Sequence, residues 1–151
     1  MDRQLMTDIG NTVGRFDRFK PYFHSFSESA EKNWNGDKGH GLAFIESSDN
    51  KILAKGLDRE LVIRYRIVQS RDGTLAGELS CSRVCQRLDD KYQEELIYVV
   101  YLDRLGNVHE HLDRHGSQFN IGDQKYADIF GYEIIRYLLE SQAVAPFEFS
   151  T

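Results

Sequence analysis

Two histidines in the last third of the chain have the spacing that best fits a chemical site. His109 and His111 alternate with Val108, Glu110 and Leu112 in a short strand-like run. In an extended strand the two imidazoles point to the same side, about 7 Å apart, which suits a shared metal ion. The same alternation allows a simpler interpretation, in which Val108 and Leu112 take the buried face and both histidines face solvent. His109 and His111 are therefore candidate metal ligands, and no cofactor is otherwise predicted.

Two cysteines offer a second set of ligands. If their strand lay beside that of the histidines, Cys81 and Cys85 could complete a Cys2His2 zinc site. However, Cys81 shares a strand face with Leu75 and Leu79, and a free cysteine more often behaves as a small buried hydrophobe. Two cysteines are also too few for a disulfide framework, so we expect reduced thiols.

Motifs for bond-making chemistry are weak. The sequence has no Gly-x-Ser-x-Gly nucleophile elbow. The glycine-rich segment 35–41 lacks the Gly-Lys-Ser/Thr ending of a phosphate-binding loop. Acidic pairs at 89–90 and 94–95 fall in connections, where carboxylates are normally solvated. These patterns favour binding over catalysis.

Length and composition predict one globular domain over residues 1–151. The chain is 40% hydrophobic, 12% aromatic and 28% charged, and residues 143–151 are expected to form an extended tail. A net charge of -5 argues against a nucleic-acid partner, since phosphate neutralisation needs excess Lys and Arg. The sequence has neither a signal-peptide pattern nor an apolar run long enough to span a bilayer, so we expect a cytoplasmic protein without a membrane partner.

Two helices are predicted before the first strand. Apolar residues three and four apart predict a helix from about Asp2 to Lys20. Gly10 and Gly14 each weaken this helix by about 1 kcal/mol relative to alanine, so it should depend on packing against the body. Pro21 is expected to end or kink it, and a second helix follows to about residue 34.

The middle of the chain changes to a period of two. Strand-like runs at 42–46, 52–55, 61–69, 75–84, 94–103 and 108–112 are separated by short turns, which force antiparallel neighbours in a meander of about six strands. The apolar run 96–102 predicts a central strand.

A long amphipathic helix from about 123 to 142 should lie across the sheet, giving an α+β fold. This order of elements resembles the helix-grip arrangement, in which a curved sheet wraps a final helix and encloses a ligand cavity.

Two features predict partner binding. Arg64 and Arg66 share the polar face of one strand, where they form either a local basic patch or an ordinary solvated face. Phe23, Phe26 and Trp34 add more apolar surface to the helices than a small core needs, so they either pack tightly on the sheet or serve a partner. The leading hypothesis is a small acidic protein that binds another protein without catalysis, as immunity proteins, inhibitors and secretion chaperones do. The partner could carry a basic surface, or a second copy could form a homodimer. The alternative is a small-ligand or metal-dependent enzyme-like domain with a cavity between the sheet and the last helix.

Overall fold

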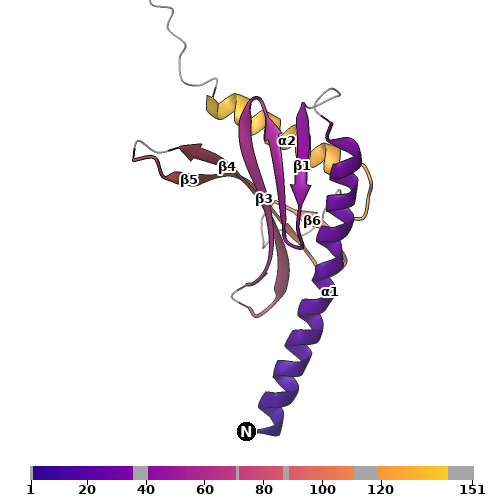
Figure 1. The fold of residues 1–151 in the computed structure, drawn as a ribbon. Helices are drawn as coiled ribbons and strands as arrows, with labels where there is room; N and C mark the ends of the chain where they lie inside the picture. Colours follow the sequence, from indigo (N-terminus) through magenta and orange to yellow (C-terminus); the bar gives the residue numbers. More distant parts are fainter. Residues whose placement is uncertain (1, 36–40, 71, 87–88, 111–118, 143–151) are drawn as a thin grey trace, which may run out of the picture.

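Figure 1 shows the computed structural model, which describes residues 2–35, 41–70, 72–86, 89–110 and 119–142, without the side chains of residues 8, 12, 16, 141 and 142. The elements are α1 (Arg3–Asn33), β1 (Leu42–Ser47), β2 (Lys51–Gly56), β3 (Arg59–Gln69), β4 (Leu75–Gln86), β5 (Tyr92–Leu102), β6 (Val108–His109) and α2 (Tyr126–Gln142). The six strands form one antiparallel sheet in sequence order. The predicted α+β meander with a C-terminal helix is confirmed. The predicted tail at 143–151 lies outside the described residues.

One hydrophobic core holds the helices against a single face of the sheet. Leu61, Ile63 and Tyr65 of β3 point into it, as the alternation of the sequence predicts, and Leu79 and Cys81 lie opposite them on β4. Side chains from both α1 and α2 belong to the same buried cluster. None of the helices in the described ranges has both the length and the hydropathy that crossing a bilayer requires.

Helix α1 is continuous through Pro21, so the predicted end at this residue and the separate second helix are wrong. A proline inside a helix removes one hydrogen bond, here to the carbonyl group of Asp17. Both Asp17 and Pro21 are exposed, so the carbonyl group that loses its helical partner lies outside the core. Phe19 and Phe23, on either side of the proline, are buried against the sheet. Packing on both sides therefore keeps the helix in one piece.

Strand β5 is not central, contrary to the prediction from its apolar run. It is fifth in the order of six strands, beside the two-residue β6. Val100 and Leu102 are fully buried, but Leu96 is 59% exposed. Figure 1 shows the distal parts of β4 and β5 leaving the sheet as a two-stranded arm. The β-formers in this arm follow strand propensity without being covered by a helix.

Helix α2 has the predicted position. Phe130, Ile134 and Leu138 are fully buried on its inner face. The ring centroids of Phe130 and Tyr98 on β5 are 5.2 Å apart, so this contact packs the helix against the sheet. The space under this helix is thus occupied by packed side chains.

Tyr65 joins α1 to the sheet. Its hydroxyl group donates a hydrogen bond to the carbonyl oxygen of Phe19 at 2.6 Å, and its ring stacks on Phe23 with centroids 5.5 Å apart. Gly77 leaves the space that this ring occupies, since an added Cβ would lie 2.5 Å from the hydroxyl oxygen. Burial raises the pKa of Tyr65 above its usual value, so the hydroxyl stays protonated and able to donate.

Replacing that glycine should loosen the contact between helix and sheet. We expect Gly77→Ala to lower the free energy of unfolding by about 1–3 kcal/mol, because the tyrosine ring must move. Gly14→Ala is the matched control: outside its own helix backbone, no atom of the described residues lies within 4 Å of its added Cβ, and it should gain up to about 1 kcal/mol from helix propensity. Denaturant unfolding measures both, and equal midpoints for Gly77→Ala and the wild type would contradict the assigned role.

Candidate functional site

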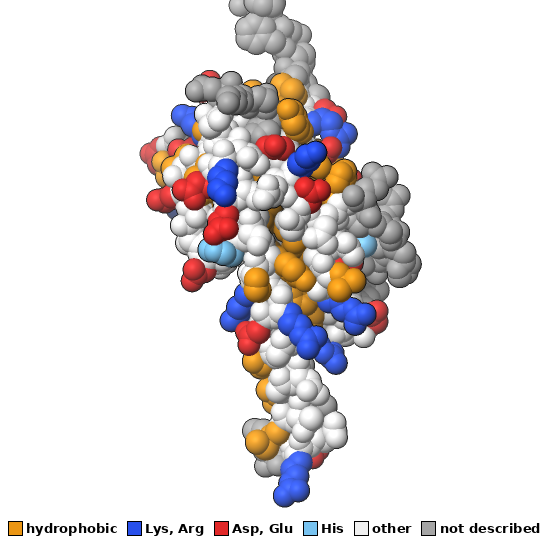
Figure 2. All heavy atoms as spheres, turned by 90° about the vertical axis from the view of Figure 1, so that its right-hand side faces the viewer, with side chains coloured by type: hydrophobic (Ala, Val, Ile, Leu, Met, Phe, Trp, Pro, Cys, Tyr) orange, Lys and Arg blue, Asp and Glu red, His pale blue; other side chains and the backbone are white. Residues whose placement is uncertain are grey.

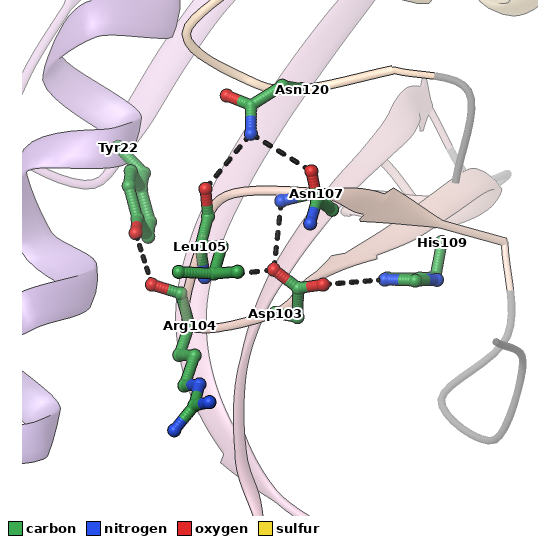
Figure 3. A network of polar contacts seen from close by, with 7 residues as sticks. All are labelled: Tyr22, Asp103, Arg104, Leu105, Asn107, His109 and Asn120. Carbon is green, nitrogen blue, oxygen red and sulfur yellow. Dashed lines mark hydrogen bonds and ion pairs between the residues drawn. The ribbon is translucent and has the colours of Figure 1, made fainter. Parts of the chain in front are cut away.

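A polar network closes the turn between β5 and β6 (Figure 3). One carboxylate oxygen of Asp103 accepts hydrogen bonds from the backbone amides of Leu105 and Asn107, both at 2.9 Å. The other oxygen pairs with Nε2 of His109, also at 2.9 Å. Burial by itself would raise the pKa of Asp103, but the hydrogen bonds from His109, Asn107 and Leu105 outweigh it and hold this pKa below its usual value.

The same turn is tied to two other parts of the fold. The side-chain amide of Asn120, in the segment before α2, donates to the carbonyl oxygen of Leu105 at 2.9 Å and to Oδ1 of Asn107 at 3.1 Å. From α1, the hydroxyl group of Tyr22 donates to the carbonyl oxygen of Arg104 at 2.5 Å. These contacts give the network a structural role, because each of them fixes the turn in place.

His109 therefore differs from the interpretation that left it in solvent. Its side chain is only 13% exposed, because β6 turns it toward Asp103. Its Nδ1 atom is buried without a hydrogen-bond partner among the described residues, so Nε2 alone orients the ring. His111 lies outside the described residues, and the metal site at this pair stays a prediction.

The zinc site that would add the cysteines is not assembled. Strand β5 lies between β4, which carries Cys81 and Cys85, and β6, which carries His109. Cys81 is fully buried opposite Ile63 and Tyr98, and burial raises the pKa of its thiol. Within the described ranges, no group of three or more His, Cys, Asp or Glu side chains could hold a metal ion.

The arginines predicted to bind a partner are each paired with a carboxylate. Arg64 donates to both oxygens of Glu94, at 2.5 and 3.2 Å, and Arg66 donates to both oxygens of Glu78, at 2.6 and 3.3 Å. The guanidinium groups remain substantially exposed. This face of the sheet thus alternates in charge, and the role of Arg64 and Arg66 in partner binding stays a prediction.

The aromatic residues predicted at a partner surface lie in the core instead. Phe23, Phe26 and Trp34 are each at most 2% exposed. The ring of Phe26 lies 5.2 Å from that of Phe130, and Nε1 of Trp34 donates to the carbonyl oxygen of Ala127 at 3.0 Å. Phe26 and Trp34 thus contact α2, whereas Phe23 stacks on Tyr65 of β3, so a partner would not reach any of the three in this structure.

A groove of about 1010 Å³ lies between the second half of α1 and the neighbouring strands. Phe23, Tyr65 and Ile67 provide its apolar lining, and Lys20 and Glu31 provide charges of opposite sign. It does not lie between the sheet and α2, where the ligand cavity was expected. That interface holds the fully buried Phe130, Ile134 and Leu138.

The most unusual surface is the first half of α1, residues 2–18, which we call the protruding segment. Every described side chain in it is exposed, and Figure 1 shows it extending beyond the sheet. Leu5, Met6, Ile9 and Val13 are 50, 57, 49 and 54% exposed. Figure 2 shows such apolar side chains along one edge of the helix. The expectation that this part of the helix packs against the body is therefore wrong, since burial begins only at Phe19.

Comparisons of the chain with protein-family models, with curated proteins and with solved structures find no match. Among the described surfaces, the protruding segment combines exposed apolar side chains with a regular spacing that suits a partner.

The carboxylate at the β5–β6 turn should give stability a specific acid dependence. Because the folded-state pKa of Asp103 is lowered, its ionised form contributes stability above the usual carboxyl pKa of about 3.9, and this is lost as the pH falls through the folded-state pKa. Asp103→Asn should cost about 1 kcal/mol at neutral pH and remove this part of the pH dependence.

Unfolding titrations from neutral pH to acid would measure the effect. Asp49→Asn, at an exposed carboxylate in the β1–β2 turn, serves as the control. The same acid dependence in the wild type and in Asp103→Asn would show that the network does not depend on this charge.

Proposed function

We propose that this protein acts in the cytoplasm by docking onto another protein molecule, and that the protruding segment of α1 is the docking element. The observation that carries the proposal is the stripe of four large apolar side chains, each about half exposed, on a helix that extends beyond its own body. Single exposed apolar residues are common on soluble proteins, but a contiguous stripe is typical of an interaction site. Helices with such a stripe bind in a groove or against another helix.

The weakness of the segment as an isolated helix supports a bound partner. The segment is the first part of the 31-residue helix α1, and Gly10 and Gly14 within it each cost about 1 kcal/mol relative to alanine. The body anchors only the end of the segment next to Phe19. Contacts with a docked molecule would supply the packing that the sheet does not provide here.

The protruding segment differs in net charge from the rest of the chain. Residues 2–18 contain three aspartates and three arginines, so their formal charges sum to zero, whereas the whole chain carries -5. The acidic excess thus lies on the rest of the chain, and the neutral segment can approach a partner without net charge repulsion. Immunity proteins, inhibitors and secretion chaperones work in this way, by covering a partner's surface.

A second candidate is small-ligand binding in the groove beside α1. Its volume of about 1010 Å³ is at the upper end of the range for ligand pockets, roughly 300–1,000 Å³. Its lining combines apolar rings with charges of both signs, which suits a zwitterionic molecule.

This candidate can be tested with a screen of zwitterionic small molecules. We expect a true ligand to raise the midpoint of thermal unfolding of the wild type and to lose this effect in Ser47→Trp, which narrows the groove at an exposed position. Equal shifts in both proteins would place the ligand elsewhere.

Docking through the segment can be tested by photo-crosslinking in cell extract at low salt. A photoreactive phenylalanine derivative at Ile9 should give covalent adducts, because this side chain lies in the apolar stripe. The same group at Asn11, which is exposed on the opposite side of the helix, is the matched control and should give few. Equal yields at the two positions, or no adduct from position 9, would contradict the proposed function.

A further inference from the structure

We infer that the molecule covering the apolar stripe is a second copy of this chain, with the two protruding segments paired antiparallel. The inference rests on the proposed function, because it names the occupant of the same surface. Three features of the segment favour a second copy over an unrelated helix, and each concerns its self-complementarity about one central residue.

The first feature is the symmetry of three of the four residues in the apolar stripe. Leu5, Ile9 and Val13 are spaced four residues apart, so they lie on one side of the helix, and all three are about half exposed. A two-fold axis through Ile9 places Leu5 of each copy opposite Val13 of the other, and the two Ile9 side chains meet at the centre. A two-fold interface requires a surface of this kind, which complements itself when reversed.

The second feature is the charge beside the stripe. At 100° per residue, Arg3 and Asp17 lie on the same flank of the helix. In the antiparallel register, Arg3 stands at the level of residue 15 of the other copy, about 3 Å along the axis from Asp17, which is within reach of an arginine side chain. Two symmetric ion pairs result. Asp17 pairs with Lys20 at 3.1 Å in the single chain, but both side chains are more than half exposed, so a change of partner costs little.

The third feature is the space for a second helix. Gly10 and Gly14 lie on the same flank as these charges, and no described atom lies within 4 Å of a Cβ added at either position. Because these residues have no side chains, this flank stays open for the Arg3 and Asp17 side chains of the ion pairs. In the same register, Asp2 reaches the level of residue 16 of the other copy, so the paired region ends before Phe19, the first buried residue. The two bodies therefore lie at opposite ends of the pair.

A charge reversal tests the register. Sedimentation equilibrium of the full chain from about 1 µM to about 1 mM covers the range of weak helix pairing. We expect a monomer–dimer equilibrium for the wild type. Arg3→Asp and Asp17→Arg should each raise the dimer Kd at least about tenfold, because two attractive pairs become two repulsive ones.

The combination of both substitutions separates pairing from simple damage to the helix. The double variant should return to within about threefold of the wild-type Kd, since its charges are again complementary. When the two single variants are mixed, they should form a heterodimer that is tighter than the homodimer of either variant. Asn11→Asp, on the opposite side of the helix, should leave the Kd unchanged. All substituted side chains are exposed, and the circular dichroism of each variant verifies that it is folded.

Two results would overturn the inference: a wild type that stays monomeric at about 1 mM, or a double variant no tighter than the single ones. The crosslinking experiment at position 9 then distinguishes failure of the homodimer from failure of the proposed function. Adducts from position 9 that contain only a different protein would leave the proposed function standing without the homodimer. Absence of any adduct would remove both.

Discussion

The contact between Tyr65 and helix α1 is the interaction on which the rest of the structure depends. Its hydroxyl group holds the carbonyl oxygen of Phe19, its ring stacks on Phe23, and Gly77 provides the space for that ring. Burial begins at the same turn of the helix. This contact therefore fixes both the position of the packed half of α1 and the point at which the protruding segment leaves the body.

Most of the fold follows from local patterns in the sequence. The alternation of Leu61, Ile63 and Tyr65 predicts the buried face of β3 correctly, because a strand has a period of two and its short turns force antiparallel pairing. The wide apolar face of α2 likewise predicts its position across the sheet. In both elements the buried residues recur with the period of the element itself, so the sequence pattern is enough to predict the buried face.

The errors arise where tertiary packing decides. A helix break at Pro21 is the local preference, but Phe19 and Phe23 gain more from burial on either side than the proline costs. The apolar period of α1 is similar in its covered and uncovered halves, so no local signal shows that Leu5 and Ile9 lie beyond the sheet. Strand propensity in β5 similarly says nothing about its place in the sheet.

In the candidate sites, too, local pattern predicts the position of a residue on its strand, whereas its contacts depend on the tertiary structure. The spacing of His109 predicts a metal ligand, which stays a prediction, whereas its contact with Asp103 at 2.9 Å depends on the β5–β6 turn. Arg64 and Arg66 were correctly placed on the polar face, yet their carboxylates come from β5 and β4 and depend on the register of the sheet. Pairing between strands, which the sequence specifies only indirectly, assembles these polar contacts.

In the proposed assembly, the protruding segment gains its packing from a second molecule, whereas the rest of α1 gains it from the body. Hydrogen–deuterium exchange of the wild type at low and high protein concentration measures this most directly. We expect the backbone amides of residues 6–18 to exchange more slowly at high protein concentration, and those of residues 23–33 to be equally protected at both concentrations. Exchange of residues 6–18 that does not depend on concentration would contradict the proposed assembly.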